Sequence, residues 1–177
     1  MKRGEKAGQF YLIAAIIISV ILIGFVSMVN YSKRQESISL QNIGEELKIE
    51  SENVFDFGTY KGYDESQMQG LAGDFIDDYI NYNDDKKDSY FLFGNANNIK
   101  AFGYSESDKT IYVDAGSGYV EMSITAGEIS SHEFTPAGND IIIKIDEKDY
   151  EFKLKSGENF YFVILDNIKG EEHVVRN

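Results

Sequence analysis

Carboxylates are the one abundant reactive type of side chain in this sequence. Asp and Glu number 30 against 17 Lys and Arg, which gives a formal net charge of −13. The stretch NDDKKD contains Asp84, Asp85 and Asp88 close together, and clustered hard oxygen atoms are the ligands that calcium prefers. Two lysines interrupt this stretch, which also lacks the alternating D-x-D-x-D-G pattern of a calcium loop. We therefore expect a solvated acidic surface, and these three aspartates are only weak candidates for metal ligands.

Other reactive groups are scarce. The chain contains no cysteine, which excludes disulfides, thiolate metal sites and a cysteine nucleophile. Its two histidines, His132 and His173, lie far apart in sequence, and we expect both in exposed loop or tail positions. There is no G-x-S-x-G elbow, phosphate loop or dinucleotide fingerprint. The acidic balance argues against nucleic-acid binding, which needs a basic surface. We expect no catalytic residue, no cofactor and no enzymatic activity.

The longest apolar run has the length of a membrane span. It begins with Phe10, Tyr11, Leu12 and Ile13, ends at Val29, and contains no charge over twenty residues. A helix of that length extends about 30 Å, the thickness of a bilayer's hydrocarbon core. A signal peptide has a shorter apolar region and a small-residue cleavage site after it. The sequence therefore predicts a retained transmembrane helix over residues 9–30.

Charge on either side of the run suggests its orientation. Lys2, Arg3 and Lys6 precede it, and Lys33 and Arg34 follow it. Cytoplasmic flanks are enriched in Lys and Arg, so the three basic residues and the amino terminus favour a cytoplasmic N-terminus. The chain after the run contains 14 Lys and Arg against 29 Asp and Glu, a balance that anionic lipid repels. We expect an acidic extracytoplasmic domain that stands off the membrane.

The junction before the apolar run has a family resemblance. A short basic leader ends at Gly8, and Gln9 and the apolar helix follow; this resembles the class III signal of archaeal type IV pilins and archaellin-like proteins. The resemblance covers about the first 30 residues. It implies that a prepilin peptidase removes the leader, residues 1–8, by cutting between Gly8 and Gln9. Many pilins have a Glu used in assembly at the fifth mature position, where this chain has Ile13. The alternative is an ordinary single-pass anchor with an uncut N-terminus.

Residues 31–57 have the pattern of an amphipathic helix. The apolar side chains recur at three, four and seven residues, the spacing of one helical face, and acidic residues occupy mostly other faces. This pattern predicts a stem helix that continues the membrane helix, with a break near Ser32 or Gly44 considered. The alternative is a first helix that ends near Arg34 and a second one that begins near Ser37. A long N-terminal helix, half in the membrane and half packed on a sheet, is also what the pilin resemblance implies. The face comprises Leu40, Ile43, Leu47 and Val54.

A second, shorter helix follows the GTYKGY stretch. Asp64 is a candidate N-cap, and Gln67 stands three residues later, which is the spacing of a capping box. The residues after it form an apolar stripe that we expect in the core: Met68, Leu71, Phe75, Ile76, Tyr79 and Ile80. The charged NDDKKD stretch ends this helix.

The remaining residues have the period of β-strands. Short aromatic or branched runs alternate with Gly, Asn, Asp and Ser clusters, which is typical of an antiparallel meander with hairpins at SESDK, AGSG, DEK and SGEN. Two nearly continuous apolar runs, 141–143 and 160–165, should be covered on both faces. Val174 and Val175 could form a last edge strand. The seven predicted strands are 90–93, 99–104, 110–114, 119–125, 140–145, 150–154 and 159–165.

The predicted fold class is therefore α+β. A long N-terminal membrane-spanning helix precedes an extracytoplasmic domain over residues 58–177 with a second helix and a sheet of about seven antiparallel strands, pilin-like or a small sandwich. We expect a structural or adhesive cell-surface protein, alone or as a filament component. Its expected partners are the lipid bilayer, pilin-like subunits and a prepilin peptidase. The alternative is a single-pass anchored β-rich module that recognises a protein or sugar without forming filaments.

Overall fold

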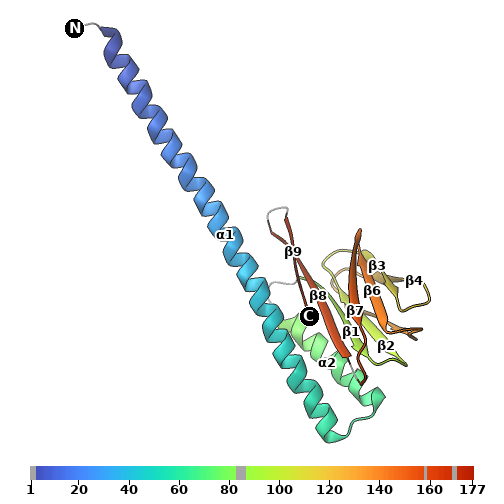
Figure 1. Ribbon diagram of the computed structural model, residues 1–177. Helices are drawn as coiled ribbons and strands as arrows, with labels where there is room; N and C mark the ends of the chain where they lie inside the picture. The colour runs from blue at the N-terminus through green and yellow to red at the C-terminus, as the bar shows by residue number, and fades with distance from the viewer. Residues whose placement is uncertain (1–2, 83–86, 158, 169–170) are drawn as a thin grey trace. The chain divides into compact units, whose positions relative to one another are not determined.

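The computed structural model describes the backbone of residues 3–82, 87–157, 159–168 and 171–177. Side chains are described within these ranges except at 3–15, 29–30, 32–37, 168 and 171. Two helices, α1 (Arg3–Lys61) and α2 (Glu65–Tyr82), precede the strands (Figure 1). The strands are β1 (Asp88–Gly94), β2 (Ile99–Tyr104), β3 (Lys109–Asp114), β4 (Tyr119–Ile124), β5 (Ser130–Phe134), β6 (Asp140–Ile145), β7 (Lys148–Lys153), β8 (Asn159–Ile168) and β9 (Glu171–Arg176). The α+β class is confirmed.

The chain forms two compact units, Met1–Ser39 and Leu40–Asn177. The second unit begins within the range that the sequence assigned to a stem. Helix α1 includes both Ser32 and Gly44, the two positions at which a break was considered. Where side chains are described, no helical stretch is both long enough and apolar enough to cross a bilayer.

All the strands belong to two antiparallel sheets, one of five strands in the order β5-β2-β1-β8-β9 and one of four in the order β4-β3-β6-β7. The predicted meander is therefore wrong, and the small sandwich is the better description. The stretches AGSG and DEK do form hairpins, between β3 and β4 and between β6 and β7. The stretches SESDK and SGEN instead connect strands of different sheets.

Asn159 explains why the chain changes sheets at SGEN. Its side-chain carbonyl accepts the Lys155 amide at 2.8 Å, and its Nδ2 donates to the Lys155 and Gly157 carbonyls at 3.1 and 3.0 Å. The same Nδ2 lies 3.3 Å from the carbonyl of Gly94, at the end of β1. One buried amide thus fixes the connection from β7 and joins it to the neighbouring strand of the five-stranded sheet.

The core between the two sheets contains alternating residues from facing strands. Val163 and Leu165 of β8 point into it, as do Ile141 and Ile143 of β6, and all four are buried. The opposite face of β8 is also buried, which confirms the prediction that residues 160–165 are covered on both faces. The prediction is wrong for 141–143, because Ile142 on the outer face of β6 is half-exposed.

A helical layer covers the outer face of the five-stranded sheet (Figure 1). Residues 40–61 of α1 contribute Leu40 and Leu47, which are 2% and 0% exposed. The predicted stripe of α2 packs here, with Leu71, Phe75 and Tyr79 half-buried, and the buried Ala72 joins it. The sheet contributes Phe91, Phe93, Phe102, Tyr104, Phe162 and Ile164.

The capping box at the start of α2 is confirmed. The backbone N–H of Gln67 donates to the Asp64 carboxylate at 2.9 Å, and the Gln67 side chain accepts the Asp64 N–H at 3.0 Å. These two bonds satisfy groups that the helix itself leaves without partners.

Glycines in α1 allow close contacts within the second unit. A Cβ at Gly44 would lie 2.5 Å from Cγ2 of Val175 in β9, and one at Gly58 would lie 2.4 Å from Sδ of Met68 in α2. Gly44 therefore marks the place where a strand packs against the helix backbone, and it does not end the helix.

The structure describes nine strands where the sequence predicted seven, and the two additional strands are β9 and β5. Strand β9 extends over Glu171–Arg176, so the Val174–Val175 edge strand is confirmed and longer than expected. Strand β5, with the sequence SSHEF, was not predicted, because Phe134 is its only apolar residue and its only buried one. A segment of that composition has no visible alternation of apolar and polar residues. It becomes a strand through its pairing with β2.

Candidate functional site

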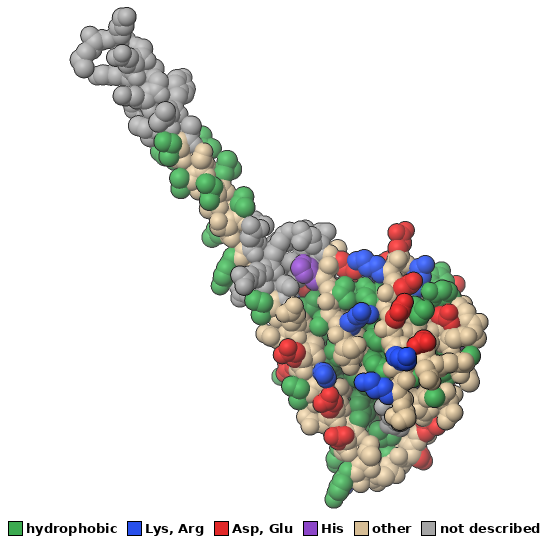
Figure 2. All heavy atoms as spheres, viewed as in Figure 1, with side chains coloured by type: hydrophobic (Ala, Val, Ile, Leu, Met, Phe, Trp, Pro, Cys, Tyr) green, Lys and Arg blue, Asp and Glu red, His purple; other side chains and the backbone are tan. Residues whose placement is uncertain are grey.

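The predicted processing and anchor residues belong to α1, but their side chains lie outside the described residues. This applies to Gly8 and Gln9, and equally to Phe10, Tyr11, Leu12, Ile13 and Val29. The described part of the apolar run is residues 16–28, and its large side chains are all exposed, from 51% at Ile21 to 72% at Met28. Figure 2 shows these hydrophobic side chains along the helix between two grey stretches. They are Ile16, Ile17, Ile18, Val20, Ile21, Leu22, Ile23, Phe25, Val26 and Met28.

The weak metal candidates do not form a described site. Asp84 and Asp85 lie outside the described residues, whereas Asp88 begins β1. Its carboxylate accepts a hydrogen bond from Lys109 Nζ at 2.5 Å, and the neighbouring Lys87 pairs with Asp166 at 2.6 Å. No group of three His, Asp or Glu residues with metal-binding geometry occurs in the described part of the chain. Asp88 thus serves an ion pair between strands of the two sheets.

The prediction that both histidines lie in exposed loop or tail positions is wrong. His132 is exposed but lies in β5, with its ring centroid 4.7 Å from that of Phe134. His173 lies in β9 and is half-buried, and its buried Nε2 has no hydrogen-bond partner among the described atoms. His132 and His173 lie in β5 and β9, the two strands that the sequence pattern indicated least clearly.

A buried tyrosine hydroxyl lies in the core between the sheets. Tyr90 in β1 is 0% exposed, and its hydroxyl has no hydrogen-bond partner within the described structure. Burial raises the pKa of Tyr90 well above its usual value, and the negative charge of Asp88 adds to this. The hydroxyl is protonated at neutral pH and is no base.

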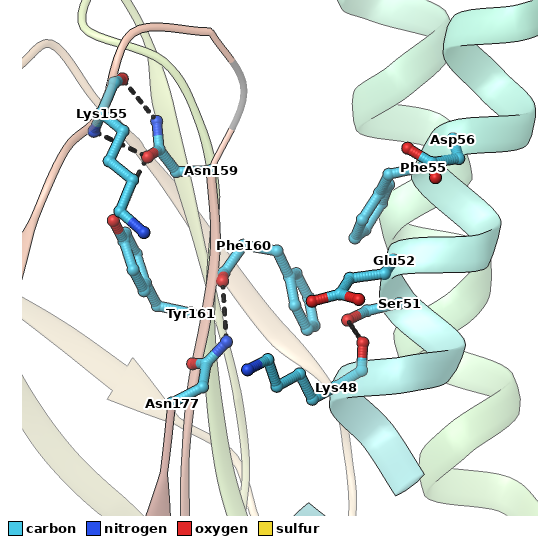
Figure 3. Close-up of a pocket in the computed structure, with 10 residues that line it drawn as sticks. All are labelled: Lys48, Ser51, Glu52, Phe55, Asp56, Lys155, Asn159, Phe160, Tyr161 and Asn177. Carbon is cyan, nitrogen blue, oxygen red and sulfur yellow. Dashed lines mark hydrogen bonds between the residues drawn. The ribbon is translucent and has the colours of Figure 1, made fainter. Parts of the chain in front are cut away.

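The first groove, which we call the β8 groove, lies between α1 and β8 and encloses about 350 Å³. Figure 3 shows the lining residues of α1 on one side and those of β8 and its neighbouring segments on the other. Phe55 and Phe160 pack against each other within it, with ring centroids 5.1 Å apart. Its lining residues are Lys48, Ser51, Glu52, Phe55, Asp56, Lys155, Asn159, Phe160, Tyr161 and Asn177.

The polar groups of the β8 groove mostly satisfy the backbone. Ser51 donates to the carbonyl of Lys48 at 2.9 Å, one turn back in its own helix. Asn177 accepts the Phe162 amide and donates to the Phe160 carbonyl, so its side chain continues the pairing of β9 with β8. Tyr161 donates to the carbonyl of Lys153, and burial raises its pKa. Among these described residues no hydroxyl is hydrogen-bonded to a basic side chain, which is the arrangement that activates a hydroxyl nucleophile.

The second groove, which we call the α1–α2 groove, lies between the two helices and encloses about 600 Å³. Three aromatic residues of α2 line it, together with one acid from each helix. The full set is Glu50, Phe75, Asp78, Tyr79, Asn81 and Tyr82. This combination suits the binding of a ligand with a positive charge and an apolar body.

Sequence reasoning missed both grooves. It placed Phe75 and Tyr79 in a core stripe, which they partly are, and it assigned Asn159 to a hairpin. The available indication was an Asn two residues after Gly157, because Asn side chains often hydrogen-bond to nearby backbone groups in turns. No protein-family model, curated protein or solved structure matches this chain.

Proposed function

We propose that this chain is a membrane-anchored extracytoplasmic structural or adhesive protein with a pilin-like layout. The observation that supports it best is the exposure of ten large apolar side chains over residues 16–28, none less than 51% exposed. Apolar side chains on all sides of a helix need an apolar surrounding, either lipid or other helices. A bilayer around residues 9–30 supplies it, with the N-terminus in the cytoplasm.

The layout of the second unit supports the pilin-like part of the proposal. Residues 40–61 of α1 lie on a five-stranded antiparallel sheet, and Leu47 at their centre is fully buried. A long N-terminal helix whose latter part packs on a sheet is what the resemblance at Gly8 and Gln9 implies. We further propose that a prepilin peptidase cuts between these two residues, and that subunits associate through the apolar helix.

Two matched substitutions test the anchor. Ile21 and Ile49 lie on the same helix at similar exposure, 51% and 60%, but only Ile21 belongs to the apolar run. A lysine at the centre of a span costs about 3 kcal/mol relative to an apolar residue, or about a hundredfold in partitioning. We expect Ile21→Lys to move the protein out of carbonate-washed membranes and Ile49→Lys to leave it there. Equal retention of both variants would contradict the anchor.

Processing and assembly need separate measurements. Mass spectrometry of the mature protein from its native host should find Gln9 as the first residue; an intact Met1 would exclude the peptidase step and leave an ordinary anchor. Electron microscopy of sheared surface material, with an antibody against the second unit, should label filaments. Labelling spread only over the cell envelope would exclude filaments and favour the second candidate below.

The second candidate is an anchored binding module, and one surface favours it. On the outer face of the four-stranded sheet, Tyr112 and Tyr119 are 40% and 49% exposed, and Lys144 lies 6.0 Å from the Tyr119 ring centroid. The strand register places Tyr112 opposite Glu121 and Tyr119 opposite Asp114. Exposed tyrosines are enriched at protein–protein interfaces, so these two rings favour partner recognition by this face. Tyr112→Ala with Tyr119→Ala should abolish surface adhesion if this face binds a partner.

A further inference from the structure

The α1–α2 groove has an aromatic floor held in place by the sheet. Phe75 packs edge-on against Phe160 at 5.9 Å between ring centroids, and Tyr79 packs edge-on against Phe91 at the same distance. Both rings are half-buried, so each still presents surface to the groove. Tyr82 is 91% exposed and stands at the rim. The aromatic part of the site is therefore largely preformed, which lowers the entropic cost of binding.

The charged residues that line the groove are both acidic. Glu50 and Asp78 approach it from α1 and α2, and no lysine or arginine is among its lining residues. Within the described structure neither carboxylate has an ion-pair partner. Glu46, Asp74 and Asp77 are further exposed acids of the two helices, outside the groove lining. A negative surface of this kind repels anions and raises the encounter rate of cations.

The chemistry of these groups selects the ligand. A cation over an aromatic face is attracted by the ring quadrupole, and the attraction grows when the cation is partly desolvated. A guanidinium stacks on aromatic rings and also pairs with a carboxylate through two parallel hydrogen bonds, whereas an ammonium acts as a point charge. The volume of about 600 Å³ falls within the range of ligand sites and exceeds what one side chain needs.

We propose that the α1–α2 groove binds an arginine-bearing basic peptide segment of a partner protein. The guanidinium stacks on Tyr79 and Tyr82 and pairs with Asp78 or Glu50 across the groove. This site is independent of the membrane anchor, because all its residues belong to the second unit. Failure of the anchor proposal would leave it standing, and the reverse also holds.

The test uses the full chain in detergent micelles and a fluorescein-labelled peptide that alternates glycine and arginine. Binding is followed by fluorescence anisotropy at about physiological salt, which screens weak surface attraction. We expect Tyr82→Ala and Asp78→Asn each to weaken binding about tenfold, the loss of one cation–π contact or one charged pair. Tyr82 is 91% exposed, so its replacement leaves the fold intact.

Matched controls separate the groove from general attraction to an acidic protein. Asp77→Asn makes the same charge change one residue away, outside the groove, and should alter binding less than about twofold. The glycine–lysine peptide should bind more weakly than the glycine–arginine peptide. Equal weakening by Asp77→Asn and Asp78→Asn would overturn the proposal, as would equal affinity for both peptides or no binding.

Discussion

Two stretches of α1 differ in the exposure of their apolar side chains. In residues 16–28 the large apolar side chains face every direction and none is less than half exposed. In residues 40–61 Leu40 and Leu47 are buried, and acids such as Glu45 and Glu46 occupy the exposed positions. The second stretch is an amphipathic helix that its own chain covers, and the first has no cover from the described part of its own unit.

The difference indicates which stretch of α1 stabilises the second unit. Burial of an apolar side chain stabilises by about 1.5–3 kcal/mol, and the second stretch gains this from α2 and the five-stranded sheet. The first stretch gains no such burial from the described part of its own unit. Substitutions should therefore affect the stability of the second unit when made in residues 40–61, and leave it unchanged when made in residues 16–28.

Leu47→Ala should have the largest effect. Leu47 is 0% exposed, and removing a buried leucine costs about 3 kcal/mol, including the cavity left behind. Ile21→Ala removes a similar volume from the exposed stretch and should change the free energy of unfolding by less than about 0.5 kcal/mol. Urea unfolding in micelles, followed by tyrosine fluorescence because the chain has no tryptophan, measures both. Equal losses would contradict the comparison.

Gly44→Ala should have a smaller effect of the same kind. The added Cβ would lie 2.5 Å from Val175, and such overpacking costs about 1–3 kcal/mol, against a gain of about 1 kcal/mol in helix propensity. The expected net loss is about 1 kcal/mol. Gly24→Ala has no atom within 4 Å of its Cβ and should leave the second unit unchanged.

A second substitution sharpens this prediction. Val175→Ala in the Gly44→Ala background removes the side-chain atoms that the new methyl group meets, so it should cost less than Val175→Ala alone. Additive losses in thermal unfolding would show that the cost of Gly44→Ala does not come from contact with Val175.

Tyr90→Phe should have the smallest effect, with the opposite sign. The buried Tyr90 hydroxyl has no partner among the described atoms, so its removal should stabilise by about 1 kcal/mol at neutral pH. Burial raises the pKa of Tyr90 in the folded state. Above pH 10, near the usual pKa of tyrosine, the unfolded state loses its proton first, so stability falls as pH rises. Tyr90→Phe should reduce this alkaline slope, and an unchanged slope would exclude Tyr90 as its source.

Much of the fold could be predicted from local patterns. The capping pair Asp64–Gln67 and the buried positions Leu40 and Leu47 follow from spacing alone, because both depend on neighbours within a turn or two of one helix. Most strands could be predicted from the alternation of apolar and polar residues. These features need no knowledge of how distant segments meet.

The rest depends on contacts between distant segments. Asn159 directs the chain into the other sheet through a bond to Gly94, 65 residues away, and β5 becomes a strand only by pairing with β2. The α1–α2 groove likewise needs Glu50 and Asp78 to meet across two helices. Such arrangements leave no periodic trace in the sequence. A small sandwich was therefore only one of two expected architectures, and neither the points at which the chain changes sheets nor the groove could be predicted.

The central claim is that lipid surrounds residues 16–28, whereas the chain covers one face of residues 40–61 and water contacts the other. Because the chain has no cysteine, a single nitroxide label can be placed at Ile21→Cys or at the matched Ile49→Cys in the protein reconstituted into liposomes. Electron paramagnetic resonance then compares collisions with oxygen, which concentrates in lipid, and with a water-soluble nickel complex. We predict high oxygen and low nickel accessibility at Ile21 and the reverse at Ile49. Nickel accessibility at Ile21 equal to that at Ile49 would contradict the account.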